Sequence, residues 1–157
     1  MKTKNFAKLI TAILLVSLLA LTLFACINPG NDNEGTMTLV LINGDDVKEY
    51  VVDLSKLPSG DKQSTGLIAV LDYLQNEGKL TYSASDGFLN RVGNLEGSSA
   101  EHTFIAIYTS VEKDKAPEAD WVKNITHKGV KCTTSIEGAK TMSILADCVV
   151  ILCIDTY

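Results

Sequence analysis

The sequence is poor in the side chains that most often carry catalysis and metal binding. It has only two histidines, His102 and His127, which stand apart and have no Cys-x-x-Cys pair near them. Zinc sites need clustered cysteine and histidine at short spacings, so the sequence predicts no metal site. It also lacks a P-loop and a Gly-x-Ser-x-Gly nucleophile elbow. These absences argue against the common nucleotide-dependent and serine-dependent enzymes, and the sequence predicts no catalytic residue and no cofactor.

Positive charge is also scarce. The 157 residues include 14 basic and 19 acidic side chains, and Lys2, Lys4 and Lys8 lie before or at the start of the first apolar run. Downstream of residue 25 the balance is therefore 11 basic against 19 acidic residues, a net charge of −8. Nucleic-acid binding needs clustered lysine and arginine, so nucleic acid is excluded as a partner. Electrostatic attachment to anionic lipid is disfavoured for the same reason.

One short segment would suit a hydrolase. Ser98, Ser99 and His102 lie within five consecutive residues. Nearness along the chain is not the geometry of a triad, because the base must reach its nucleophile and be oriented by a third group. A hydrolase is therefore the weaker alternative to a binding protein.

The N-terminal segment is built like a secretory signal. Its lysines precede an apolar run of about 16 residues, 9–24, which is shorter than the roughly 20 residues needed to span a bilayer. The run is followed by the polar stretch 28–35, without a basic stop-transfer cluster. These features favour a cleaved signal peptide over a transmembrane anchor.

The end of this segment, Leu23-Phe24-Ala25-Cys26, resembles the lipobox of bacterial lipoproteins. The resemblance implies that residues 1–25 are removed and that Cys26 is diacylated on sulfur. Two acyl chains give stable attachment, since each buried methylene contributes about 0.8 kcal/mol. We therefore expect an extracytoplasmic protein anchored to a bacterial membrane by lipid. Residues 26–35 form a flexible tether, and 36–157 form a single domain.

The domain has the residue pattern of an α+β fold. Residues 36–54 alternate about an Asn43-Gly44 turn and predict a hairpin. Leucines at helical spacing predict a helix over 66–77, whereas 81–87 reads as irregular. The other extended segments all follow the helix: 87–95, 103–110, 130–135 and 147–155. This order predicts a β-grasp-like mixed sheet with one main helix on one face.

These elements also resemble a known family, the transcobalamin-like C-terminal domains. The resemblance is carried by the hairpin 36–54, the helix segment Leu-Ile-Ala-Val-Leu-Asp-Tyr-Leu at 67–74, and Gly87-Phe88. The later strand at 104–110 lacks the family's Asn-Gly, and the closing Leu-x-Asp-Gly-Asp is reduced to Leu145 and Asp147. The resemblance implies a β-grasp fold and a corrinoid-like ligand.

Three aromatic residues are the candidates for ligand binding: Trp121, Tyr108 and Phe88, in falling order. Aromatic side chains give a large contact area at low entropic cost, which suits a flat apolar ligand. Trp121 has a second interpretation, as a side chain folded onto a sheet edge to cover it, because tryptophan is highly buried on average. The alternative partner is an extracytoplasmic protein that adds a strand to an exposed sheet edge.

Three cysteines remain in the domain: Cys132, Cys148 and Cys153. Cys148 and Cys153 have an odd separation on one expected strand, so they face opposite sides. Cys132 is therefore the residue that would pair with either of them. Three buried thiols are the favoured interpretation, since free cysteine is among the most buried residue types.

We predict that the mature protein starts at a lipidated Cys26. Intact-mass analysis of protein extracted from membranes is expected to show residues 26–157 plus the acyl mass. A Cys26→Ala variant should keep its signal segment and lose that mass. Wild-type protein that retains residues 1–25, or that carries no acyl group, would refute the lipobox assignment.

Overall fold

The computed structural model describes residues 34–57 and 66–157. The predicted signal peptide, Cys26 and most of the tether lie outside these residues. Within the described part, no helix has the length and apolar character needed to cross a membrane.

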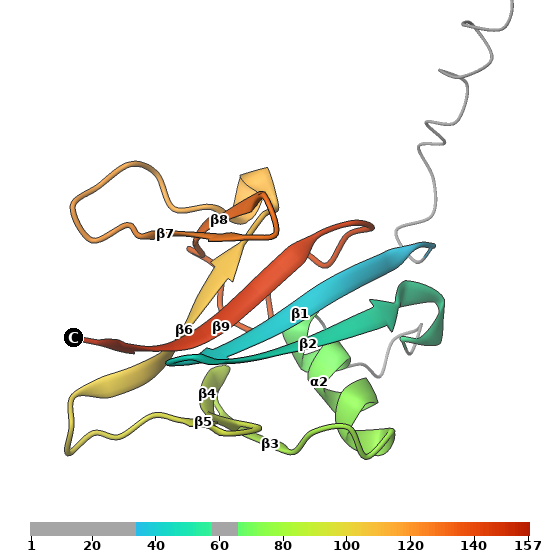
Figure 1. Cartoon of the computed structure of the whole chain (residues 1–157), viewed down its shortest axis with the longest axis horizontal. Helices are drawn as coiled ribbons and strands as arrows, with labels where there is room; N and C mark the ends of the chain where they lie inside the picture. The colour runs from blue at the N-terminus through green and yellow to red at the C-terminus, as the bar shows by residue number, and fades with distance from the viewer. Residues whose placement is uncertain (1–33, 58–65) are drawn as a thin grey trace, which may run out of the picture. The chain divides into compact units, whose positions relative to one another are not determined.

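The described residues form a mixed α+β fold with one α-helix, as predicted. Six strands make a curled sheet in the order β2-β1-β9-β6-β8-β7, and a second sheet has the order β3-β4-β5 (Figure 1). The elements are β1 Thr36–Asn43, β2 Asp46–Asp53, the 3-10 turn η1 Leu54–Lys56, α2 Gly66–Asn76, β3 Tyr82–Ser85, β4 Phe88–Val92, β5 Leu95–Glu96, β6 Thr103–Thr109, the 3-10 turn η2 Glu112–Asp114, β7 Asn124–His127, β8 Val130–Thr134 and β9 Val149–Thr156.

The hairpin β1–β2 forms where the alternation predicts it. Its strands pair from Thr36 opposite Asp53 to Asn43 opposite Asp46. Gly44 occupies the turn with φ +60°, a conformation that favours glycine. Val52 is fully buried, whereas its neighbour Val51 is 63% exposed, so β2 presents one face to the core.

Strand β9 lies at the centre of the large sheet. It pairs in parallel with β1 and antiparallel with β6 (Figure 1). Val150 and Leu152 face the core that contains α2, and Val149 and Ile151 face a second apolar cluster on the other side. The run of apolar residues in β9 thus reflects burial on both faces.

Helix α2 covers one face of the sheet. Its apolar residues recur at helical spacing and are buried against β1, β2 and β9. The chain leaves the helix through Gly78, whose φ of +67° is the left-handed conformation common just after a helix end. The buried side chains of α2 are Leu67, Ile68, Ala69, Val70, Leu71 and Leu74.

The hairpin β7–β8 covers the opposite face. Cys132 of β8 and Ile125 of β7 pack with Tyr108 and Ile151 of the sheet. The ladder between β8 and β6 is short, with only Tyr108 and Thr109 paired. Packing therefore holds this hairpin to the sheet more than backbone hydrogen bonds do.

An ion cluster links the tip of this hairpin to β2. The Glu49 carboxylate lies 2.7 Å from Lys128 Nζ and 3.2 Å from His127 Nε2. Because Lys128 donates a hydrogen bond to it, with a smaller contribution from His127, the pKa of Glu49 is held below its usual range. We refer to Glu49, His127 and Lys128 as the clasp, since they join the two edge strands of the sheet.

The expectation of irregular structure over 81–87 is wrong. Tyr82–Ser85 forms β3 and pairs with β4, with a register shift between Ser83 and Ala84. The segment Tyr-Ser-Ala-Ser has no apolar alternation, and it becomes a strand because β4 offers it a partner. The Tyr82 hydroxyl also donates to Asp72 of α2, and burial followed by this contact raises the pKa of Tyr82 to about 12.

We predict that Val52→Ala destabilises the protein far more than Val51→Ala. Val52→Ala leaves a cavity in the core and should lower the free energy of unfolding by about 2 kcal/mol. The second removes exposed methyl groups and should change stability by less than about 0.5 kcal/mol. Urea unfolding of both variants measures the difference, and equal effects would contradict the assigned hairpin faces.

The lowered pKa of Glu49 in the clasp predicts that this residue contributes to the loss of folding stability in acid. A carboxylate with a lowered pKa stabilises the fold above its unfolded pKa, and this contribution is lost as pH falls through the folded pKa. Glu49→Gln should therefore lower stability at pH 7 and lose less stability than wild type between about pH 5 and 3. Glu77→Gln, at an exposed position beyond α2, is the control. Parallel stability–pH curves for wild type and Glu49→Gln would contradict the assignment.

Candidate binding groove beside β6

A groove of about 830 Å³ runs along β6. This volume lies within the range of small-molecule sites, about 300–1,000 Å³. The walls come from segments that are far apart in the sequence: residues 86–89 around the β3–β4 turn, 104–108 of β6, Trp121 and Lys123 before β7, 134–141 after β8, and 155–157 at the end of β9.

The groove gathers most of the exposed apolar side chains of the described residues. Among the described residues, eight large hydrophobic side chains are exposed, and five of these eight line this groove. A contiguous exposed apolar surface is unusual on a monomeric protein and marks interaction sites. The five are Phe88, Phe104, Trp121, Ile136 and Tyr157.

Local backbone geometry explains the exposure of Phe88. Asp86 and Gly87 both take positive φ, 53° and 89°, in the tight turn between β3 and β4. Phe88 follows directly and is 76% exposed. At the end of β9, the Tyr157 ring lies 6.2 Å from the Phe104 ring, measured between centroids. The groove therefore has two aromatic positions besides Trp121, one at Phe88 and one at the Phe104–Tyr157 pair.

A polar network occupies one part of the lining. The Tyr108 hydroxyl donates to Asp155 Oδ2 at 3.1 Å, and Lys123 Nζ donates to Asp155 Oδ1 at 2.5 Å. Burial, with the neighbouring Cys153 and Asp155, raises the pKa of Tyr108 well above its usual value. Burial alone would raise the pKa of Asp155, but hydrogen bonds from Lys123, Thr156 and Tyr108 hold it below its usual range. At neutral pH the network thus places a neutral phenol beside a carboxylate.

All three predicted aromatic residues line this one groove. Trp121 is 57% exposed, so the interpretation of Trp121 as a buried cover for a sheet edge is wrong. Tyr108 is almost fully buried and contributes to the lining from β6. That these residues bind a ligand stays a prediction. The sequence reading missed Phe104 and Tyr157, although Phe104 shares its strand face with Tyr108.

The geometry does not support the hydrolase alternative. Ser98 Oγ accepts a hydrogen bond from the Glu101 amide, and the His102 ring packs edge-on against Tyr157 at 5.5 Å. Among the described residues, no hydrogen bond joins the His102 imidazole to Ser98 or Ser99. The nucleophile–base contact that a triad requires is therefore not formed in this turn.

The cysteines and acidic residues do not form a metal site or a disulfide in the described part of the chain. Cys132, Cys148 and Cys153 are free, and burial raises the pKa of each thiol. No group of three or more histidine, cysteine, aspartate or glutamate side chains is placed to hold a metal ion within residues 34–57 and 66–157.

Comparison with known proteins gives a distant structural likeness. No family model matches the chain, and no curated protein matches it. A crystal structure from Ruminococcus gnavus, of a protein provisionally described as metal-binding, is similar with a TM-score of 0.47 and 12% sequence identity. The match covers 79% of this chain and 99% of the other. At this level of similarity, the function of that protein does not transfer.

Proposed function

We propose that the protein is a lipid-anchored, extracytoplasmic binding module whose groove beside β6 takes a ligand with an extended apolar surface. The observation that carries this proposal is the concentration of five exposed hydrophobic side chains in one groove. The network of Tyr108, Lys123 and Asp155 supplies a few polar groups next to this surface. An apolar lining with a small number of polar groups is the usual composition of a small-molecule site.

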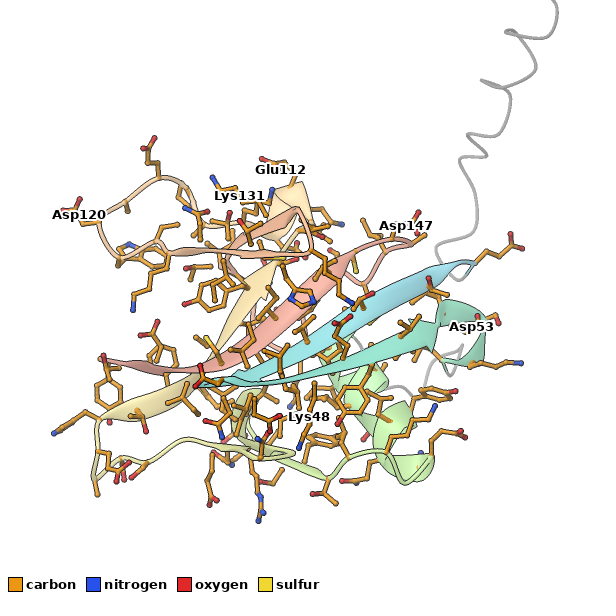
Figure 2. All side chains as sticks on the ribbon, in the orientation of Figure 1. Lys48, Asp53, Glu112, Asp120, Lys131 and Asp147 are labelled. Carbon is orange, nitrogen blue, oxygen red and sulfur yellow. The ribbon has the colours of Figure 1, made fainter. Side chains whose placement is uncertain are left out.

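The position of the groove fits an anchored receptor. The chain enters the sheet at Thr36, whose carbonyl accepts a hydrogen bond from the Asp147 amide at 2.7 Å. Strand β9 runs parallel to β1 from this end and finishes at Thr156 in the groove, and its eight residues span about 23 Å. Figure 2 shows Asp147 beside the start of β1, whereas Asp120, the neighbour of Trp121, lies on the opposite side of the domain. The groove thus lies away from Thr36, where the chain enters the sheet.

The strand order supports a β-grasp-like assignment as part of this proposal. A hairpin precedes the helix, and the last strand returns between β1 and β6, parallel to β1. Under this assignment, a flat corrinoid-like molecule is the first small ligand to test. The aromatic positions at Phe88, Trp121 and Tyr157 would contact its apolar face.

Trp121 is the sole tryptophan of the chain and therefore reports directly on the groove. We predict that cobinamide, added to the full chain in detergent, quenches Trp121 fluorescence saturably after correction for absorbance. Calorimetry with Trp121→Ala should show binding weakened by at least about tenfold. Val51→Ala, an exposed apolar residue outside the groove, should bind like wild type. A linear response up to about 1 mM, where the binding free energy is only about −4 kcal/mol, would exclude the corrinoid.

A further inference from the structure

One part of the groove places two aromatic rings beside an acidic side chain. Phe104 of β6 is the cross-strand partner of Asp155 of β9, and such partners point to the same face of a sheet. Tyr157 lies just beyond β9, and its ring is 6.2 Å from the Phe104 ring between centroids. All three residues line the groove, and the Asp155 side chain is partly exposed. We refer to Phe104, Asp155 and Tyr157 as the aromatic corner.

The two rings of the corner are exposed and lie at an angle to each other. Their planes are tilted by 46°, and 42% of Phe104 and 73% of Tyr157 are exposed. The Tyr157 ring also packs edge-on against His102, and the Tyr157 amide donates to the His102 carbonyl at 3.1 Å. A cation within about 6 Å of a ring centroid is attracted by the negative face of the ring. Two exposed rings this close together therefore favour a cationic group at one shared position.

The charged side chains of the groove also favour a cation. The lining holds three acidic side chains and two lysines, namely Asp86, Glu137 and Asp155 against Lys123 and Lys140. Lys123 is paired with Asp155, and Lys140 is engaged by a contact of its own. The chain downstream of residue 25 has a net charge of −8, and a field of this sign attracts cations and repels anions.

The rest of the groove is suited to an apolar group attached to that cation. Phe88, Trp121 and Ile136 line it and are each more than half exposed. Covering such apolar surface contributes about 25 cal/mol per Å². The apolar part of the ligand would therefore supply affinity, and the charged part would supply selectivity.

We propose that the ligand of the groove is an amphiphilic organic cation, an alkylated ammonium compound whose charged head sits in the aromatic corner. Its methyl groups contact the rings of Phe104 and Tyr157, and Asp155 supplies the opposite charge. Quaternary ammonium groups are the cations that aromatic sites recognise most often. The apolar remainder lies against Phe88 and Trp121. This inference rests on the proposed function, because it names the class of ligand for the same groove.

The test uses hexyltrimethylammonium, with 1-hexanol and hexanesulfonate as neutral and anionic compounds that carry the same hexyl chain. Each is titrated into the full chain in non-ionic detergent, and calorimetry measures the affinity. We expect the cation to bind saturably and at least about fivefold more tightly than either comparison compound, because a cation–π contact contributes about 0.5–2 kcal/mol. Equal affinity of all three compounds, or tighter binding of hexanesulfonate, would overturn the cationic head group.

Variants of Tyr157 separate the aromatic ring from its apolar area. Tyr157→Leu keeps an apolar side chain but removes the ring, so it should weaken binding of hexyltrimethylammonium by about fivefold and leave that of 1-hexanol unchanged. Tyr157→Phe keeps the ring and should bind like wild type, as should Val51→Ala, which lies outside the groove. Tyr157 is largely exposed, so folding should tolerate both substitutions. Wild-type affinity of Tyr157→Leu, or equal losses in both Tyr157 variants, would contradict the aromatic corner.

Cobinamide distinguishes a failure of this inference from a failure of the proposed function. Saturable binding of cobinamide or 1-hexanol, without tighter binding of hexyltrimethylammonium, would overturn the inference and keep the proposed function. Binding of none of these compounds would contradict both.

Discussion

The parallel pairing of β1 with β9 is the constraint on which the rest of the structure depends. It joins the first and last strands of the domain in the middle of the sheet, so β9 is buried on both faces. A strand in that position needs a cover on each side. Helix α2 supplies one cover and the β7–β8 hairpin supplies the other, and both are placed by the apolar residues of β9 (Figure 1).

The groove is a consequence of how the sheet ends beside β6. The small sheet β3-β4-β5 diverges from one end of this strand, and β8 pairs only with the other end. Between them, the side chains of Phe88 and Phe104 are left exposed. The same parallel pairing carries the C-terminal residues of β9 to this place, so that Asp155 and Tyr157 complete the lining.

The β7–β8 hairpin connects the clasp with the groove, because its tip carries His127 and Lys128 and its flanking segments line the groove. Trp121 and Lys123 lie directly before β7, and the loop after β8 supplies another wall. The hairpin is held by two residue pairs with β6, by packing around Cys132, and at its tip by Glu49. The ion pair between Lys123 and Asp155 holds the other end. The shape of the groove therefore depends on contacts made on both sides of this hairpin.

Local periodicity was enough to predict the hairpin 36–54, the helix and the apolar terminal strand, because each depends on residues close together in the chain. It was also enough to select Trp121, Tyr108 and Phe88, which all line the groove, since aromatic residues are recognisable one by one in the sequence. The strand at 82–85 and the groove positions of Phe104 and Tyr157 could not be predicted, because each depends on which strands become neighbours. By itself, the sequence determined the α+β class and the elements with strong alternation. Only the tertiary structure decided which strands flank β6 and β9, because those pairings join residues 24 to 111 positions apart.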